Sequence, residues 1–121
     1  MVRALFDTNV LIDYLNGVDA AKKELARYEY RAISMITWME VLVGTTPEDE
    51  AAVRAWLCSF DVIVLDASIS NREVELLKQR RIRLHDAIVW ASAQVSSMLM
   101  VSRNTKDFPA DEPGVRVRYK I

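Results

Sequence analysis

The stretch from Arg3 to Leu15 constrains the fold more than any other part of this sequence. A mostly apolar run leads into Asp7, two small polar residues follow, and apolar residues then recur at helical spacing. This pattern predicts a short buried strand, a tight turn and a helix. Ligands of open parallel α/β sheets bind at the carboxyl ends of the strands. Asp7 is expected at such an end, where a carboxylate is a good metal ligand.

Strand and helix patterns alternate through the rest of the chain, which predicts a parallel sheet with helices on both faces. The predicted strands are residues 3–6, 31–36, 61–66, 98–101 and 115–119. The predicted helices are residues 10–15, 20–28, 48–60, about 71–79 and 86–93, with a further strand-to-helix junction at 37–44. The expected fold is an α/β/α sandwich around a mainly parallel sheet of about five strands. A chain of 121 residues fits one domain, residues 1–121.

Details of three elements are also predicted. The third strand is continuously apolar, as in strands covered on both faces, whereas the last alternates like an edge strand. Asp19 can cap the helix at 20–28, and either Ser70 or Asn71 can cap the helix that ends near residue 79.

Composition narrows the function classes. The net charge of −1 gives no overall attraction to nucleic acid, although it does not exclude a local basic patch. Cys58 is the one cysteine, so neither an internal disulfide nor a cysteine-rich zinc site is possible. No signal peptide or membrane span is expected, because acids interrupt the apolar run near the start. We therefore expect a cytoplasmic protein without a membrane partner.

Four acids share one kind of position in the predicted fold. Each stands just past a strand or at the first turn of a helix, and they are Asp7, Glu40, Asp86 and Asp107. Clustered carboxylates repel one another unless some bind protons or a cation. Mg²⁺ and Mn²⁺ prefer oxygen ligands and retain bound water for chemistry. The acids thus predict a divalent metal site.

Each acid also has a purely structural interpretation. Asp7 can cap the first helix, and Thr37 with Glu40 has the spacing of a capping box. Asp86 can simply be a favourable charge at a helix N-terminus, and Asp107 a turn residue. The metal interpretation is favoured because all four fall at the same kind of junction. His85 is not expected to act directly in catalysis, since a metal can itself lower the pKa of water.

Four motifs resemble those of a known family. The segments DTNVLID at 7–13, TxxExxxG at 37–44, DAI at 86–88 and SRNxxDF at 102–108 resemble the motifs of PIN-domain nucleases. The resemblance is closest to VapC-type toxins of toxin–antitoxin pairs and extends over nearly the whole chain. It implies a Mg²⁺- or Mn²⁺-dependent endoribonuclease, a cognate antitoxin and a homodimer. It also implies that the first and fourth strands are adjacent.

The resemblance assigns roles to individual residues. Asp7, Glu40, Asp86 and Asp107 would be the catalytic and metal-binding acids. The expected supporting residues are Thr8, Asn9, Thr37 and Asn104. The basic residues near the motifs are candidates for binding the RNA backbone, and they are Arg81, Arg83, Arg103 and Lys106.

The chain departs from the family pattern at three places. His85 stands where relatives often have proline, Trp90 where a small residue is usual, and Ser96-Ser97 where glycine is common. None of these residues is expected to contact an acid. Two other functions stay open: a phospho-receiver-like signalling domain and a PIN-fold binding module without catalytic activity.

Overall fold

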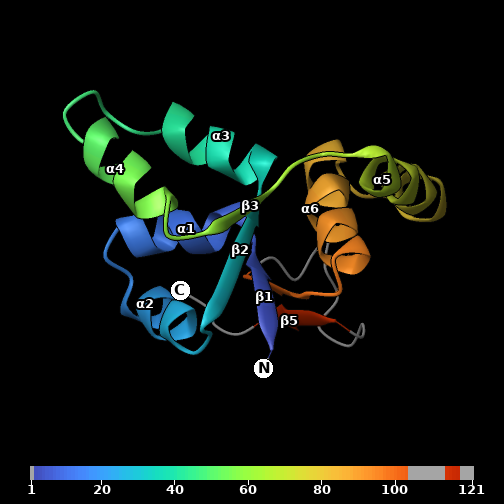
Figure 1. The fold of residues 1–121 in the computed structure, drawn as a ribbon, viewed down its shortest axis with the longest axis horizontal. Coiled ribbons are helices and arrows are strands. Elements are labelled where there is room, and N and C mark those ends of the chain that lie inside the picture. Colours follow the sequence, from blue (N-terminus) through green and yellow to red (C-terminus); the bar gives the residue numbers. More distant parts are fainter. Residues whose placement is uncertain (1, 104–113, 118–121) are drawn as a thin grey trace.

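A five-stranded, all-parallel sheet separates two layers of helices (Figure 1). The computed structural model describes residues 2–103 and 114–117. In chain order the elements are β1 (Arg3–Phe6), α1 (Thr8–Leu15), α2 (Asp19–Ala26), β2 (Tyr30–Ser34), α3 (Met35–Val43), α4 (Glu50–Leu57), β3 (Asp61–Ile63), α5 (Ala67–Gln79), α6 (Leu84–Val95), β4 (Leu99–Ser102) and β5 (Val115–Val117). The predicted sandwich is confirmed.

The strand order is β3-β2-β1-β4-β5, so β1 lies in the middle of the sheet with β4 beside it. Phe6 is in register with Val101 of β4, and Leu5 with Ala32 of β2. The backbone N–H of Asp7 donates to the carbonyl of Val101 at 2.9 Å, which extends the β1–β4 ladder by one residue. The carboxyl ends of β1 and β4 therefore meet at Asp7, as expected.

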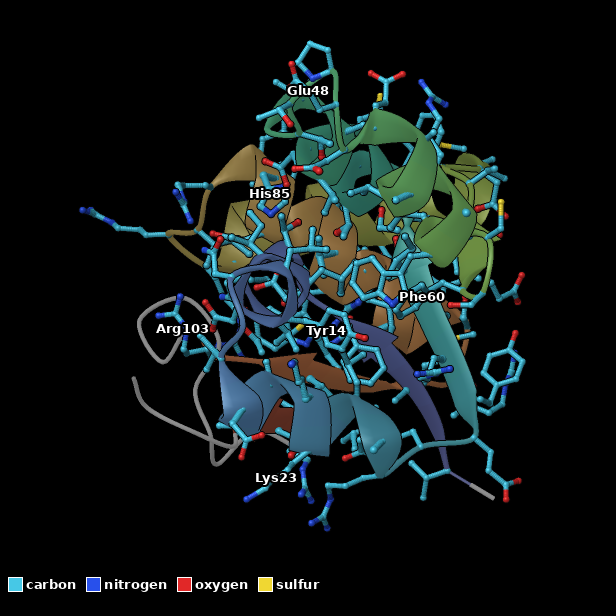
Figure 2. The ribbon with its side chains drawn as sticks, turned by 90° about the vertical axis from the view of Figure 1, so that its left-hand side faces the viewer. Tyr14, Lys23, Glu48, Phe60, His85 and Arg103 are labelled. Atoms are coloured by element: carbon cyan, nitrogen blue, oxygen red, sulfur yellow. The ribbon has the colours of Figure 1, made fainter. Side chains whose placement is uncertain are left out.

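Alternation along the strands divides the hydrophobic core between the two faces of the sheet. On β1, Ala4 and Phe6 pack with α1, α2, α3 and α4, whereas Leu5 packs against α5 and α6. The second core also holds Trp90 of α6, which is only 2% exposed. Phe60 is buried and Tyr14 half-buried, whereas Lys23 of α2 points outward (Figure 2).

The second strand ends earlier than predicted, and this moves the start of the following helix. The helix α3 begins at Met35 after Ser34, whose Oγ accepts a hydrogen bond from the backbone N–H of Ile36 at 3.3 Å. Thr37 lies inside the helix and is fully buried. The predicted capping box of Thr37 and Glu40 is therefore wrong, because Ser34 caps the helix three residues earlier.

Three other local predictions are wrong. The third strand stops at Ile63 and lies at the sheet edge, so Val64 and Leu65 are 57% and 51% exposed. Asp66, rather than Ser70 or Asn71, caps α5 by accepting from the N–H of Ile69 at 2.9 Å. Asp19 is the first residue of α2 rather than its cap.

Among residues 2–103 and 114–117, no helix is long and apolar enough to span a membrane.

Candidate metal centre

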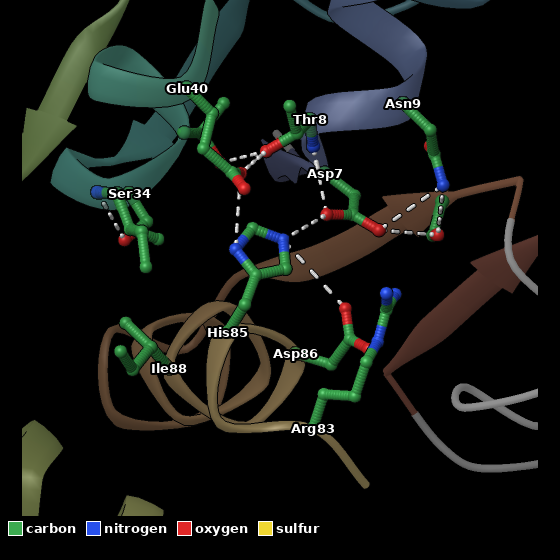
Figure 3. A network of polar contacts seen from close by, with 12 residues as sticks. Asp7, Thr8, Asn9, Ser34, Glu40, Arg83, His85, Asp86 and Ile88 are labelled. Atoms are coloured by element: carbon green, nitrogen blue, oxygen red, sulfur yellow. Dashed lines mark hydrogen bonds and ion pairs between the residues drawn. The ribbon is translucent and has the colours of Figure 1, made fainter.

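Three of the four predicted acids come together at the carboxyl end of the sheet (Figure 3). Asp7 directly follows β1, Glu40 lies in the second turn of α3, and Asp86 lies in the first turn of α6. They line one hollow of about 250 Å³. Asp107, Asn104 and Lys106 lie outside the described residues.

Asp7 is 3% exposed, and hydrogen bonds fix both oxygens of its carboxylate. Its Oδ1 accepts from the backbone N–H of Thr8 at 2.8 Å. Its Oδ2 accepts from the hydroxyl of Ser102 at 2.9 Å and from the side-chain amide of Asn9 at 3.3 Å. Asp7 thus both caps α1 and contributes to the acidic cluster, so its two interpretations are compatible.

Two threonines position Glu40. The hydroxyl of Thr8 donates to Glu40 Oε1 at 2.8 Å and lies 3.0 Å from the hydroxyl of Thr37. Each hydroxyl has a single proton, so Thr37 donates to Thr8 while Thr8 donates to Glu40. The side chain of Glu40 is 43% exposed, and this chain of bonds holds one of its oxygens toward the interior.

His85 lies among the three acids, which contradicts the expectation that it contacts none of them. Its Nδ1 is 3.1 Å from Glu40 Oε1, and its Nε2 is 3.7 Å from both Asp7 Oδ1 and Asp86 Oδ1 (Figure 3). Nδ1 is buried, and its contact with Glu40 does not have hydrogen-bond geometry. The interaction with Asp7 raises the pKa of His85 most; burial opposes this, and the charges of Glu40, Asp7 and Asp86 add to it. At 3.7 Å we regard the Asp7 contact as an ion pair rather than a hydrogen bond.

Asp86 is 1% exposed and faces two cationic groups. Its Oδ2 accepts from Arg83 Nε at 3.0 Å, while its Oδ1 faces His85. Within residues 2–103 and 114–117, the carboxylates of Asp7, Glu40 and Asp86 outnumber the charges of Arg83 and a protonated His85. The cluster is therefore a site of concentrated negative charge.

The donor set fits a divalent cation. Donor atoms of Asp7, His85 and Asp86 all lie within 4.8 Å of one another. Buried carboxylates at this spacing repel each other, and a divalent ion removes that cost while using their oxygens as ligands. Glu40 lines the same hollow and adds a further carboxylate at its half-exposed side.

The basic residues predicted to bind RNA lie in different environments. Arg103 binds Asp13 through Nε at 2.7 Å and Nη2 at 3.3 Å, and its backbone N–H donates to Asn9 Oδ1 at 3.2 Å. Its guanidinium thus has a structural partner. Arg81 and Arg83 are exposed, although Arg83 also holds Asp86.

Sequence reasoning missed two residues of the cluster. His85 directly precedes Asp86 at a helix start, and this position was the signal that could have placed it near the acids. Ser102 is the last residue of β4, and it is fully buried against Asp7. The predicted adjacency of β1 and β4 was the signal that could have identified it.

The sequence matches the family model described as PIN domain over residues 4–110. A toxin–antitoxin complex from Klebsiella pneumoniae contains a chain 43% identical to this one, with a TM-score of 0.93, covering 98% of this chain and 99% of that chain. VapBC2 from Rickettsia felis, bound to a promoter DNA fragment, is 20% identical with a TM-score of 0.76 over 96% of each chain. FitAcB from Neisseria gonorrhoeae is 20% identical with a TM-score of 0.78 over 93% of this chain and 96% of that chain. No curated protein matches the sequence. The match over most of its length shows that this chain belongs to the PIN-domain family.

Proposed function

We propose that this protein is a Mg²⁺- or Mn²⁺-dependent endoribonuclease that acts as the toxin of a toxin–antitoxin pair. The observation that supports this most is the convergence of Asp7, Glu40 and Asp86 on one hollow at the carboxyl end of the sheet. Membership of the PIN-domain family and the similarity to a chain of a toxin–antitoxin complex support the same activity.

The chemistry follows from what these side chains can hold. Asp7 and Asp86 would bind the metal, with Glu40 beside them and Asp107 as a proposed fourth acid. A bound Mg²⁺ or Mn²⁺ would supply a Lewis acid that lowers the pKa of an attacking water and offsets charge on the scissile phosphate. Ser102 and Asn9 keep the Asp7 carboxylate in one orientation, and Arg83 holds Asp86 so that Oδ1 faces the hollow.

The proposed partners are RNA, a cognate antitoxin and a second copy of the chain. The exposed residues Arg81 and Arg83 immediately precede the helix that bears Asp86 and would contact RNA phosphates. The Klebsiella relative comes from a toxin–antitoxin complex, which supports an antitoxin partner. An enzyme that cleaves cellular RNA would act in the cytoplasm.

A signalling role as a phospho-receiver is not supported by the sheet. Its strand order is 3-2-1-4-5, whereas flavodoxin-like receivers have the order 2-1-3-4-5. A binding module without activity is also less well supported, since the three described acids that a metal site needs are all in place.

The direct test is cleavage of candidate RNAs by the purified protein with Mn²⁺, with Mg²⁺ and with a chelator, followed by mapping of the cut ends. We expect internal cleavage with metal, no cleavage with chelator, and inhibition when the antitoxin is added. Absence of cleavage under every metal condition, or cleavage that persists in chelator, would contradict the proposal.

A further inference from the structure

His85 is close enough to Asp7 and Asp86 to bind the same metal ion. Its Nε2 lies 3.7 Å from one oxygen of Asp7 and 3.7 Å from one oxygen of Asp86. Two donors that bind one ion at about 2.1 Å each are separated by roughly 3.0 to 4.2 Å. The spacing of Nε2 from both carboxylates falls within that range.

The other ring nitrogen, Nδ1, lies beside the kind of group that orients metal-binding histidines. Metal-bound imidazoles almost always direct their second N–H at a carboxylate, a carbonyl or water, which fixes the ring. In this protein Nδ1 lies 3.1 Å from Glu40 Oε1, and the Thr8 hydroxyl holds that oxygen at 2.8 Å. A small rotation of the imidazole would align Nδ1–H with Glu40 and leave the Nε2 lone pair facing Asp7 and Asp86.

We propose that His85 supplies a nitrogen ligand to the divalent ion and so biases the site toward Mn²⁺ over Mg²⁺, with Glu40 positioning the imidazole. Both ions prefer oxygen ligands, but Mg²⁺ takes them almost exclusively, whereas Mn²⁺, as a transition-metal ion, also accepts an imidazole nitrogen. A site with two carboxylates and one imidazole therefore discriminates between two ions that an all-carboxylate site treats more alike. This inference rests on the proposed metal-dependent function and specifies its metal.

The test measures metal binding rather than cleavage. Calorimetry of the metal-free full chain with Mn²⁺ alone and Mg²⁺ alone gives the ratio of the two affinities. His85→Phe removes the nitrogen and keeps a flat ring, and His85→Gln places an amide oxygen near the same point. We expect His85→Phe to lose at least about tenfold in Mn²⁺ affinity with little change for Mg²⁺. We expect His85→Gln to bind both ions with a Mn²⁺-to-Mg²⁺ ratio lower than that of the wild type.

Pulsed electron paramagnetic resonance of the Mn²⁺-loaded wild type provides a readout that needs no folded variant. Coupling from an imidazole nitrogen directly bound to Mn²⁺ is expected, and it should disappear in both variants. An unchanged affinity ratio in His85→Phe, or no nitrogen coupling in the wild type, would overturn the role of His85 while leaving the metal site intact. If instead the wild type binds neither ion, or Asp7→Asn binds Mn²⁺ as the wild type does, the metal site itself is wrong and the proposed function fails with it.

Discussion

Buried acids occupy two contrasting environments in this protein. Asp13 and Glu24 are 4% and 5% exposed, and each binds an arginine that is distant in the sequence. Arg103 donates to Asp13 at 2.7 Å, and Arg116 donates to Glu24 at 2.8 Å. Asp7 and Asp86 are equally buried, at 3% and 1%, but they face each other across a single histidine with Glu40 nearby.

The contrast separates acids that pair with arginines from the acids that we propose to bind metal. The Asp13 and Glu24 pairs balance charge within each pair and connect α1 to the end of β4 and α2 to β5. Removing one partner from such a pair leaves a charge in a low-dielectric interior. The cluster at Asp7 instead concentrates negative charge, which a folded protein tolerates when the site has a cation to bind. Neutralising an acid should therefore lower stability where the acid is paired with an arginine and change it little in the Asp7 cluster.

The largest effect is expected from Asp7→Asn. The neutral amide cannot replace the anionic ligand, so metal-dependent cleavage should fall about 1,000-fold or more, equivalent to about 4 kcal/mol of activation free energy. Stability without metal should change little, because the substitution removes one of several mutually repelling charges. The measurements are RNA cleavage rates and urea unfolding of the metal-free protein. Asp13→Asn is the matched control, and it should retain metal-dependent cleavage while losing stability. Cleavage by Asp7→Asn at the wild-type rate would show that the site is misassigned.

The next largest effect is expected from Arg103→Met. This change removes both contacts of the guanidinium with Asp13, whose side chain is 5% exposed, and should lower the free energy of unfolding by about 3 kcal/mol. Urea denaturation in chelator isolates the effect from metal binding. Adding Asp13→Leu to the same chain should recover most of the loss, because the buried charge disappears with it. A loss below about 1 kcal/mol, typical of a surface ion pair, would show that the pair does not stabilise the fold.

Local sequence patterns predicted the positions of Asp7, Glu40 and Asp86 at the end of the sheet, but not the groups that surround them. The apolar run before Asp7 and the helical spacing after it placed that carboxylate at a strand end. The start of α3 was misplaced because Ser34 and Thr37 are both capable caps, and only the fold shows that the Thr37 hydroxyl contacts Thr8 of another helix. Local periodicity carries no information about that contact.

Partnerships between distant residues were the least predictable part of the site. Arg103 seemed a candidate for binding RNA because it is basic and near a motif, yet its partner Asp13 lies 90 positions away. His85 is not expected to act in catalysis because a metal can itself lower the pKa of water, yet Asp7, Glu40 and Asp86 all lie beside it. Composition identifies which groups are chemically capable, whereas the topology of the sheet determines which of them meet.

A smaller effect is expected from Thr8→Val, which tests how the cluster is positioned. The valine keeps the shape of the side chain but removes the hydroxyl that joins Thr37 to Glu40. Loss of this buried link should cost about 1 to 2 kcal/mol of stability and should also lower the cleavage rate, since Glu40 becomes free to leave its position. Urea unfolding and single-turnover cleavage measure the two effects. Wild-type cleavage combined with reduced stability would restrict Thr8 to a structural role.

The smallest effect is expected on the pKa of Tyr28, which lies beside the ion pair of Glu24 and Arg116. Its hydroxyl donates to Glu24 Oε2 at 3.3 Å, and Arg116 Nε donates to the same oxygen at 2.8 Å. Burial first, and then the charge of Glu24, raise the pKa of Tyr28 above its ordinary value of 10.0, while Arg116 opposes the shift. The fold thus favours the neutral phenol. Its contribution to stability is complete below the unfolded-state value near 10 and is lost as the pH rises through the raised pKa.

Glu24→Gln should therefore lower the pKa of Tyr28 toward its ordinary value, because the substitution removes the negative charge that disfavours phenolate and leaves Arg116 to stabilise it. Ultraviolet titration of phenolate, with Tyr28→Phe as the reference that identifies this tyrosine, measures the shift. The same substitution should leave metal binding at the Asp7 cluster unchanged, since Glu24 belongs to a charge-balanced pair on α2. If the pKa of Tyr28 does not fall, burial alone raises it. The charge of Arg116 would then cancel that of Glu24 at the Tyr28 hydroxyl.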